Sequence, residues 1–302
     1  MILKDSAKIC AGIVLYNPEL ELLQKNVDAL LEQSIKQIFL YDNNSKNAVE
    51  IAKFFRDYDK VEYLCNDENK GIAYALNQLI DYADKKGYDW CLTMDQDSVC
   101  ATNMIEEYTK YLDYPKVALI CPFVLNNGKF TLTEFEKLRL DNVTELKDPI
   151  DCITSACLNN VKIVKEVGGY TEKLFIDFVD TDLNCKVLEN NYKILRINTT
   201  YLVQQMGNAH KVPFFELLQK MTKKDVFRRM KVANVYTDQR LYYSARNSRY
   251  VRNTYKNHGK RTGIVFMFAY YCYFTLVYPM DRSRIKMWLS IIKGHRDYKK
   301  LD

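Results

Sequence analysis

The sequence predicts an α/β fold with a parallel, doubly wound sheet, and two observations lead to this prediction. Short, continuous apolar runs recur through the first 125 residues, as expected of strands that are buried on both faces. Segments with apolar residues at helical spacing separate these runs. Strands and helices that alternate in this way are typical of a parallel sheet covered by helices.

Each expected element has its own signal in the sequence. The first strand is the apolar run KICAGIVL, closed by the turn Tyr16-Asn17-Pro18. The first helix repeats apolar residues at Leu20, Leu23 and Val27. The same two signals predict a strand at 8–15, a helix at 19–33, a strand at 37–41, a helix at 49–55, a strand at 61–65, a helix at 72–86, a strand at 90–94 and a helix at 102–112.

Polar residues follow three of the expected strands, at Tyr16-Asn17, at Asp42-Asn43-Asn44-Ser45 and at Asp95-Gln96-Asp97. Ligands of doubly wound sheets bind at the carboxyl ends of the strands. We therefore expect these three segments to line one rim of the sheet and to form a ligand site there.

The region 126–210 is less regular. We expect an aromatic strand ahead of Asp177 that turns Asp177 and Asp180 inward, where a carboxylate in a partly dry cleft can act as a general base. We expect Asp182 to cap a helix at 182–190.

The charge is unevenly distributed. Residues 1–210 hold 23 Lys and Arg against 32 Asp and Glu, whereas residues 211–302 hold 21 against 6, so that the net charges are −9 and +15. This asymmetry predicts two parts with different partners, a nucleotide-binding and catalytic domain at 1–213 and a basic, aromatic helical region at 214–302. The basic part could meet nucleic acid or an anionic membrane surface.

An uncharged stretch of 19 residues at 262–280 contains four tyrosines. It could lie on a membrane surface, span the membrane, or form a buried or dimer-forming helix. Interfacial tyrosines and flanking cations favour the membrane surface. The flanking cations are Lys256, Lys260, Arg261, Arg282, Arg284 and Lys286.

Composition excludes several classes of protein. Hydrophobic residues make up 48% and charged residues 27% of the chain, which excludes disordered and low-complexity sequences. Nine cysteines, an odd number without a CxxC pair, and an N-terminus without a long apolar core predict reduced thiols in the cytoplasm. The lack of GxGxxG and GxxxxGK[ST] patterns argues against dinucleotide oxidoreductases and P-loop enzymes.

The segment Asp95-Gln96-Asp97 directly follows an expected strand. Two carboxylates spaced in this way can converge on one Mg²⁺ or Mn²⁺ ion, which in turn holds a diphosphate. The alternative is that Asp97 and Ser98 cap the helix expected at 102–112.

Two further segments offer polar groups to a ligand. Asp42-Asn43-Asn44-Ser45 could contact a base or a ribose, or could form an ordinary Asx turn. Asn69 and Gly71 begin a helix, where free backbone amides could meet a polar ligand.

Taken together, these stretches resemble the family 2 inverting nucleotide-sugar glycosyltransferases, and the DQDS and FIDFVDTD forms resemble the bacterial rhamnosyltransferase branch. The resemblance covers about residues 8–210. The matching stretches are Ile13–Pro18, Asp42–Ser45, Asn69–Ala73, Met94–Ser98, Thr154–Ala156, Val167–Tyr170, Phe175–Leu183 and, outside that range, Tyr242–Asn247.

The resemblance implies a GT-A fold, which is a Rossmann-like, mostly parallel sheet flanked by helices. It implies that Tyr16, Asn17 and Asp42 hold the nucleotide and that Asn69 and Gly71 border its ribose and phosphates.

The resemblance also implies roles in metal binding and catalysis. Asp95 and Asp97 would bind Mg²⁺ or Mn²⁺, and Asp180, with Asp177 beside it, would supply the catalytic base. The transferred sugar or the acceptor would lie near Thr154, Ser155 and Arg246.

The sequence departs from the branch at three positions. Val179 replaces the glutamate of the Glu-Asp motif, and Ala156 stands where the branch usually has glycine. Gln204 replaces a histidine that can help to bind the metal, and His210 follows six residues later. Either His210 reaches the metal through a changed loop, or the metal shell lacks a histidine.

The expected reaction moves L-rhamnose from dTDP-L-rhamnose to a hydroxyl of a lipid-linked glycan acceptor, with inversion. Alternative donors are UDP-galactofuranose, UDP-glucose and UDP-galactose. We expect a cytoplasmic protein held at the inner, anionic face of the plasma membrane, and its helical region is also a candidate for homodimer contacts. A nucleic-acid-binding protein is the competing class, but the acidic strand ends would repel phosphates.

Overall fold

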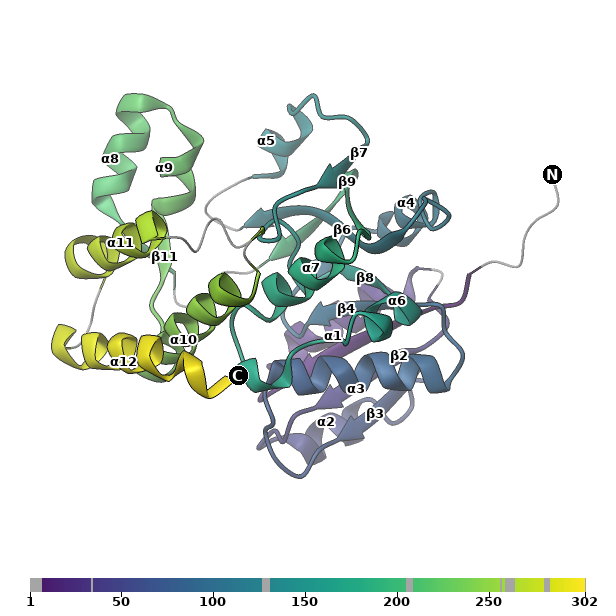
Figure 1. Cartoon of the computed structure of the whole chain (residues 1–302). Helices are drawn as coiled ribbons and strands as arrows, with labels where there is room; N and C mark the ends of the chain where they lie inside the picture. Colours follow the sequence, from purple (N-terminus) through teal and green to yellow (C-terminus); the bar gives the residue numbers. More distant parts are fainter. Residues whose placement is uncertain are drawn as a thin grey trace. The chain divides into compact units, whose positions relative to one another are not determined.

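A computed structural model describes residues 7–33, 35–126, 131–204, 209–255, 257–258, 264–279 and 283–301 (Figure 1). The chain divides into two compact units. The sheet unit comprises Met1–Val124, Arg139–Phe175 and Val179–Gln204, and the C-terminal unit comprises Leu125–Leu138, Ile176–Phe178 and Gln205–Asp302. Two short segments from the middle of the sequence therefore belong to the C-terminal unit.

The sheet unit is built on one nine-stranded sheet with the order β3-β2-β1-β4-β8-β6-β9-β5, in which β7 pairs with β9. The first four strands, β3, β2, β1 and β4, pair in parallel as expected. The strand β8 is antiparallel to β4 and to β6, and β9 is antiparallel to β5 and β7. The sheet is therefore mixed, with a parallel half that carries the expected rim. The strands are β1 (Ile9–Leu15), β2 (Ile38–Asp42), β3 (Val61–Cys65), β4 (Trp90–Asp95), β5 (Val99–Cys100), β6 (Val117–Asn126), β7 (Val143–Leu146), β8 (Cys157–Asn160) and β9 (Lys193–Gln204).

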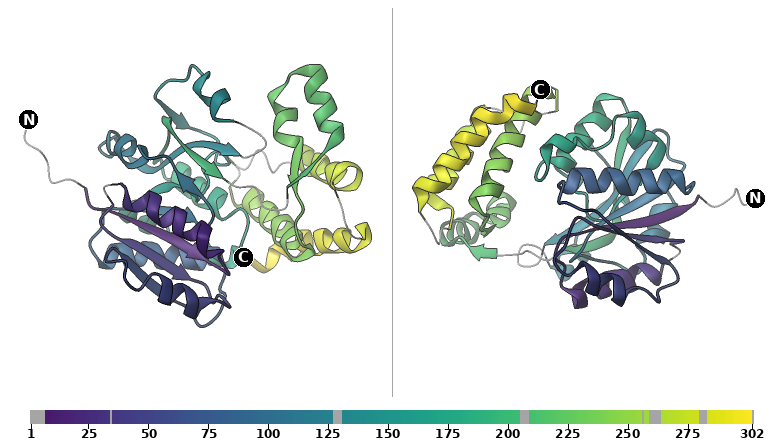
Figure 2. Two further views of the ribbon diagram at one scale, coloured as in Figure 1. Left: turned by 180° about the vertical axis from the view of Figure 1, so that it is seen from behind. Right: turned by 90° about the horizontal axis from the view of Figure 1, so that it is seen from below.

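Helices cover both faces of the parallel half. The helices α1 (Leu20–Leu31) and α2 (Ala48–Phe54) lie on one face, and α3 (Ile72–Lys85) and α6 (Val161–Glu166) lie on the other (Figures 1 and 2). This arrangement follows from right-handed crossovers, because the strand order runs outward from β1 to β3 and then returns to β4. The doubly wound fold is confirmed.

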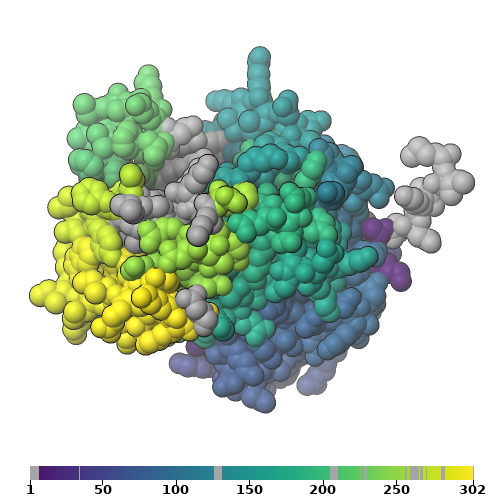
Figure 3. All heavy atoms as spheres, viewed as in Figure 1, coloured from purple at the N-terminus to yellow at the C-terminus, as the bar shows by residue number. Residues whose placement is uncertain are grey.

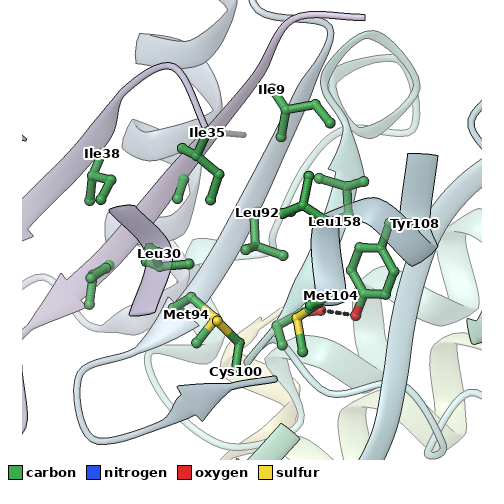
Figure 4. Close-up of a cluster of buried hydrophobic side chains, with 14 of the residues drawn as sticks. Ile9, Leu30, Ile35, Ile38, Leu92, Met94, Cys100, Met104, Tyr108 and Leu158 are labelled. Carbon is green, nitrogen blue, oxygen red and sulfur yellow. Dashed lines mark hydrogen bonds between the residues drawn. The ribbon is translucent and has the colours of Figure 1, made fainter. Parts of the chain in front are cut away.

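The largest core lies between the sheet, α1 and α4 (Met104–Thr109). Figure 4 shows Leu92 and Leu158 from neighbouring strands next to Met104 and Tyr108 of α4. Tyr108 is fully buried, and its hydroxyl donates a hydrogen bond of 2.8 Å to the Ala156 carbonyl, so that its polar atom is satisfied within the core.

Two expectations from the sequence are wrong. The helix after β5 is α4, and its N-cap is Asn103, so neither Asp97 nor Ser98 caps it. The aromatic segment before Asp177 is not a strand, because Phe175, Asp177 and Phe178 all have positive φ values, between 62° and 66°. A 3-10 helix, η1 (Glu172–Leu174), precedes this segment, and α7 (Val179–Glu189) follows it.

Asp182 is therefore not a cap, because α7 begins three residues earlier. Its side chain is fully buried and lies 3.2 Å from Lys186 Nζ, one helical turn further on. This ion pair lies within α7 and has no part in starting the helix.

The C-terminal unit is mainly helical. Its long helix α10 packs against α12, and Figure 2 shows the two side by side. Its core includes Leu241 and Ala245 of α10 and Met287 and Ile291 of α12. The elements of this unit are α5 (Leu132–Glu136), β10 (Ala209–Lys211), α8 (Pro213–Thr222), α9 (Asp225–Met230), β11 (Val232–Asn234), α10 (Asp238–Thr254), α11 (Ile264–Cys272), η3 (Tyr273–Val277), α12 (Arg284–Asp297) and η4 (Tyr298–Leu301).

The uncharged stretch at 262–280 forms α11 and η3, and its residues 262, 263 and 280 lie outside the described part. Phe274 and Tyr278 are buried in the C-terminal core, whereas Val265 and Phe268 are exposed. Within the described residues, no helix combines the length and the apolar character that crossing a membrane requires. Of the flanking cations, Lys256, Lys260, Arg261 and Arg282 lie outside the described residues.

Candidate functional site

The three polar segments that follow β1, β2 and β4 lie at one rim of the sheet, as expected. Leu15 at the end of β1 pairs in register with Asp42 of β2, and Val14 pairs with Asp95 of β4. Because the three strands are parallel and adjacent, the segments that follow them emerge side by side.

Asp95 and Asp97 lie on a turn at the end of β4, closed by a hydrogen bond from the Ser98 amide to the Asp95 carbonyl. The Asp95 amide donates to Ser155 Oγ at 3.1 Å, and Asn26 Nδ2 donates to the Asp95 carbonyl at 2.8 Å. Burial raises the pKa of Asp97, and the charge of Glu19 adds to this effect. The turn thus presents two half-buried carboxylates from a backbone that is fixed on both sides.

Gln96, between the two carboxylates, ties this turn to the end of β1. Its Oε1 accepts a hydrogen bond of 2.8 Å from the Tyr16 amide, and its Nε2 donates to the Tyr16 carbonyl at 3.3 Å. Asn17, with φ 49°, donates its amide to Ser45 Oγ at 2.7 Å. The Tyr16 side chain is half exposed, and so a flat apolar ring stands at this rim.

Asp42 is fully buried at the end of β2. Its Oδ1 accepts from the Ser45 amide at 2.7 Å, and its Oδ2 accepts from the Tyr63 hydroxyl at 2.5 Å. Burial and the hydrogen bond to Asp42 raise the pKa of Tyr63, so Tyr63 stays protonated and keeps donating. Asp42 therefore orders the turn itself, as the Asx-turn alternative predicted.

Asn43 connects the second segment to the start of α3. Its Nδ2 donates to Asn69 Oδ1 at 2.9 Å and to the Gly71 carbonyl at 3.1 Å, and its Oδ1 accepts from the Lys70 amide. The Gly71 amide donates to Asn69 Oδ1, and the Ile72 amide donates to the Phe175 carbonyl at 2.7 Å. The expectation of free amides here is therefore wrong for Lys70, Gly71 and Ile72, which the chain satisfies itself.

Gly71 is required at its position. Its φ is 86°, and a Cβ atom there would lie 2.6 Å from the Phe175 carbonyl oxygen and from a ring carbon of the same residue. Only glycine combines this backbone conformation with such a close approach.

Thr154, Ser155 and Ala156 lie in a turn ahead of β8. Ser155 is buried and supports Asp95 through its hydroxyl, and the Thr154 carbonyl accepts from Thr93 at 2.7 Å. Ala156 has φ 59° in the left-handed region, which explains why glycine suits this position. Contacts from Thr154 and Ser155 to a sugar stay predictions.

Asp180 lies in the first turn of α7 and is half-buried. Its Oδ1 accepts from the Thr181 amide at 2.7 Å and from the Thr181 hydroxyl at 3.3 Å. These bonds orient the carboxylate. The role of Asp180 as a base stays a prediction.

Asp177 belongs to the C-terminal unit, where it forms an ion pair with Arg240 of α10. The Arg240 guanidinium donates to Asp177 Oδ1 from Nη2 at 3.0 Å and from Nε at 3.2 Å. Burial raises the pKa of Asp177, and the Arg240 charge opposes that effect. Asn247 Nδ2 donates to the carbonyls of Ile176 and Asp177 at 2.7 and 2.9 Å. α10 thus holds a segment of strained backbone.

The remaining candidates, Arg246 and His210, also belong to the C-terminal unit. The Arg246 guanidinium lies 4.8 Å from the Tyr243 ring centre, and its Nε donates to Asn247 Oδ1. His210 is exposed on β10, where it pairs in register with Ala233. A metal role for His210 and an acceptor role for Arg246 stay predictions.

Sequence reasoning missed the residues that hold the site together. Asn43 and Gln96 lie inside the motifs, but their side chains were not assigned. Tyr63 and Arg240 had no signal, because nothing in the spacing of the sequence links Arg240 to Asp177, 63 residues away. Asn247 lies inside the Tyr242–Asn247 stretch, but its side chain was not assigned.

Residues 10–168 match the profile of Glycosyl transferase family 2, which covers more than half of the chain. The chain belongs to this family. A dTDP-rhamnosyl transferase RfbF of Shigella flexneri is 28% identical to it over 256 residues, which are 80% of this chain and 79% of that protein. The bifunctional glycosyltransferase pgtA of Dictyostelium discoideum is 27% identical over 112 residues, 34% of this chain and 15% of that protein.

Solved structures share the fold at low sequence identity. GalNAc-T7 with UDP, GalNAc and Mn²⁺ matches 98% of this chain and 56% of its own, with a TM-score of 0.61 and 12% identity. The S. aureus TarS fragment 1–349 matches 97% of this chain and 82% of its own, with a TM-score of 0.55 and 11% identity. These structures confirm a GT-A glycosyltransferase fold.

Proposed function

We propose that this glycosyltransferase is an inverting rhamnosyltransferase that uses dTDP-L-rhamnose. The observation that carries this proposal is the likeness to the S. flexneri dTDP-rhamnosyl transferase, which extends over 80% of the chain and so reaches beyond the family motifs. The rim supports it, because three strand ends present polar groups where sheets of this type bind ligands.

The proposed donor site uses the groups at this rim. The half-exposed Tyr16 ring would pack against the base, with Asn17 beside it. Asp42 would act by fixing its turn, because both of its oxygens already accept hydrogen bonds. Asn69 and Gly71 would border the ribose and phosphates through the loop that Asn43 orders.

The proposed metal ligands are Asp95 and Asp97, and their chemistry fits Mg²⁺ or Mn²⁺. These hard cations prefer carboxylate oxygens, and Mg²⁺ is commonly held by one or two carboxylates together with substrate phosphates and water. In the described part of the chain, no cluster of three or more His, Cys, Asp or Glu side chains could hold a metal. The two aspartates would therefore share the ion with the donor diphosphate. When bound, the ion supplies positive charge that stabilises the departing diphosphate.

The proposed mechanism is a single displacement. The acceptor oxygen forms a bond to the anomeric carbon on the face opposite the diphosphate, while the bond from that carbon to the diphosphate oxygen breaks. Asp180 accepts the proton of the acceptor hydroxyl, and dTDP leaves. Thr181 donates two hydrogen bonds to the Asp180 carboxylate, which orient the group that accepts the proton. The configuration inverts because no sugar–enzyme bond forms.

The partners follow from the same reasoning. We assign the acceptor to a glycan, carried on a lipid diphosphate, near Thr154 and Ser155. The C-terminal unit would hold the enzyme at an anionic membrane, at the inner face of the plasma membrane. Homodimerisation through this unit is the alternative use of its helices.

Donor screening tests the function. Release of the nucleoside diphosphate is measured with dTDP-L-rhamnose, UDP-galactofuranose, UDP-glucose and UDP-galactose in parallel. We expect release from dTDP-L-rhamnose alone, stimulated by acceptor. Turnover of a UDP-sugar instead would replace the donor but keep the enzyme class; TarS, which shares the fold, is solved with UDP-GlcNAc.

The metal is tested by calorimetry of dTDP with and without Mg²⁺ or Mn²⁺. We expect the ion to tighten dTDP binding in the wild type and to have no effect in Asp97→Asn. Asp59→Asn, an exposed carboxylate in the same unit, is the matched control. Equal affinity with and without the ion, together with full activity after chelation, would contradict the assignment. His210→Ala shows in the same assay whether His210 contributes.

A further inference from the structure

The C-terminal unit contains a pocket of about 450 Å³ that has no part in the proposed reaction. It lies between α10, α11, α12 and η4, and Tyr271 and Tyr298 supply its aromatic walls. Three of its lining residues are the cations Arg249, Arg296 and Lys299. A pocket that combines cations with aromatic walls suits an anion attached to an apolar group.

The charge of the pocket is positive at neutral pH. His295, which also lines it, is buried, and this burial together with the charges of Arg249 and Arg252 lowers its pKa to about 4. His295 is therefore neutral, and the three cations set the charge. The nearby Asp297 does not line the pocket. Its carboxylate accepts from Tyr242 and pairs with Lys300 at 3.1 Å, and Arg296 approaches it only to 3.8 Å.

Arg249 is held in place before any ligand binds. Its Nη1 donates to the His295 carbonyl at 3.0 Å, and its guanidinium lies 4.5 Å from the ring centre of Tyr298. Its Nε is buried and has no hydrogen-bond partner among the described residues. A positioned guanidinium of this kind favours phosphate, which it can bind through more than one hydrogen bond.

An exposed apolar stripe on α12 ends at this pocket. Ile285, Leu289 and Ile292 are 72%, 63% and 55% exposed, and their spacing of four and three residues puts them on one face of the helix. Met287 and Ile291, which are fully buried, form the face that packs into the core. Ile292 also lines the pocket. Figure 3 shows α12 and η4, in yellow, at the molecular surface.

The surroundings of the stripe identify what covers it. The exposed charged side chains next to it on α12 are cationic: Arg284, Lys286, Lys293 and Arg296. A second copy of this chain would bring the same cations and would be repelled. Nucleic acid would match the charge, and its bases could stack on the pocket tyrosines, but it would leave the stripe uncovered, because bases do not stack on aliphatic side chains. An anionic lipid matches both features, because its phosphate suits the cations and its acyl chains suit the stripe.

We infer that the pocket formed by Arg249, Arg296 and Lys299 binds the phosphate of a membrane lipid headgroup, while Ile285, Leu289 and Ile292 enter the acyl boundary. This inference deepens the proposed membrane contact from general attraction to one defined site. It does not depend on the identity of the sugar donor.

The test uses the full chain and ligands too short to form a membrane. Calorimetry measures the binding of monomeric short-chain phosphatidic acid, of short-chain phosphatidylcholine and of inorganic phosphate. We expect phosphatidic acid to bind best. We expect the double variant Arg296→Gln with Lys299→Gln to weaken its binding by on the order of tenfold or more, because each cation near a lipid phosphate contributes a several-fold effect.

The matched control is Lys286→Gln with Lys293→Gln, which removes the same charge from the same helix region outside the pocket. It should bind the monomeric lipid like the wild type. Equal losses of lipid affinity in both double variants would show that binding depends on the general positive charge of this region, and would overturn the pocket as the binding site. Inorganic phosphate that binds as tightly as phosphatidic acid would overturn the lipid as the source of the phosphate.

The stripe is tested separately by sedimentation with phosphatidic acid vesicles. Ile285→Ser with Leu289→Ser should lower sedimentation several-fold and leave monomer binding unchanged, because neither residue lines the pocket. Unchanged sedimentation would overturn the role of the stripe. Both substituted residues are exposed, and thermal unfolding confirms that the variants fold. These measurements contain no sugar donor. The lipid site can therefore be contradicted while rhamnosyl transfer is confirmed, and rhamnosyl transfer can be contradicted while the lipid site is confirmed.

Discussion

The rim of the sheet unit and the exposed face of α12 in the C-terminal unit hold their polar groups in opposite ways. At the rim of the sheet unit, side chains such as Asp42, Asn43 and Gln96 bond to backbone atoms close by, and so their positions are set by the ends of the strands. In the C-terminal unit, cations and aliphatic side chains of α12 are exposed to solvent. The first arrangement suits precise contact with a small ligand. The second suits contact with a broad, deformable partner such as a lipid membrane. We therefore test whether sugar transfer depends on the sheet unit and membrane association on the C-terminal unit.

The largest effect is expected at Asp180. Asp180→Asn should lower transfer by about 10²–10⁴-fold, the usual contribution of a general base, with dTDP affinity nearly unchanged. Single-turnover kinetics and dTDP calorimetry measure the two quantities. Asp177→Asn, which changes a carboxylate already paired with Arg240, should affect the rate far less. A wild-type rate for Asp180→Asn would show that the base lies elsewhere.

The next effect concerns the backbone of the rim. Gly71→Ala should cost about 2–5 kcal/mol of unfolding free energy, because it adds left-handed strain to a clash with Phe175. Gly87→Ala is the matched control, since Gly87 also has positive φ but has no atom within 4 Å of the added Cβ. It should cost only about 1–2 kcal/mol. Denaturant unfolding measures both, and equal losses would remove the clash as a cause.

In the C-terminal unit, a pH effect is expected from His295. Its pKa in the folded protein, about 4, lies below its ordinary value of 6.5. The unfolded chain therefore binds a proton that the folded chain does not, so stability is full above pH 6.5 and falls as the pH drops toward 4. The loss should reach on the order of 3 kcal/mol. Unfolding across this pH range should show it in the wild type and in a variant of the exposed His210, but not in His295→Gln.

The smallest effect is expected at Asn247, which holds the strained segment 176–178 within the C-terminal unit. Asn247→Ala removes the bonds to Ile176 and Asp177 and should cost about 1–3 kcal/mol of stability. It should also lower turnover, because a change in the backbone at Asp177 would displace Asp180, which follows three residues later. Asn253→Ala, an exposed change on the same helix, should alter neither quantity. A stable Asn247→Ala variant with full activity would show that the strained segment keeps its conformation without these two hydrogen bonds.

The parallel half of the sheet was predictable because its signals are local. Apolar runs define β1, β2, β3 and β4 within about a residue of their observed ends, and the polar residues after them mark the rim. The antiparallel strands β6, β8 and β9 were not predicted as a sheet, because their pairing depends on contacts between distant segments.

The strained segment could not be predicted for a physical reason. Positive φ is usually signalled by glycine, but Phe175, Asp177 and Phe178 adopt it without glycine. Arg240 and Asn247, from another part of the chain, bond to Asp177 and to the carbonyls of Ile176 and Asp177. The apolar and aromatic character of 175–178 instead indicated a strand. The proposal that Asp180 is the general base does not depend on this error, since it rests on the motif and not on the backbone.

The insertion of Ile176–Phe178 into the C-terminal unit also sets an order of events during synthesis. These residues leave the ribosome about 70 positions before Asn247, the residue that bonds to them. Until α10 has been made, the carbonyls of Ile176 and Asp177 lack their Asn247 partner, so this segment is completed late. A nascent chain that ends before α10 already contains the four parallel strands but still lacks the Arg240 and Asn247 contacts to residues 176–177.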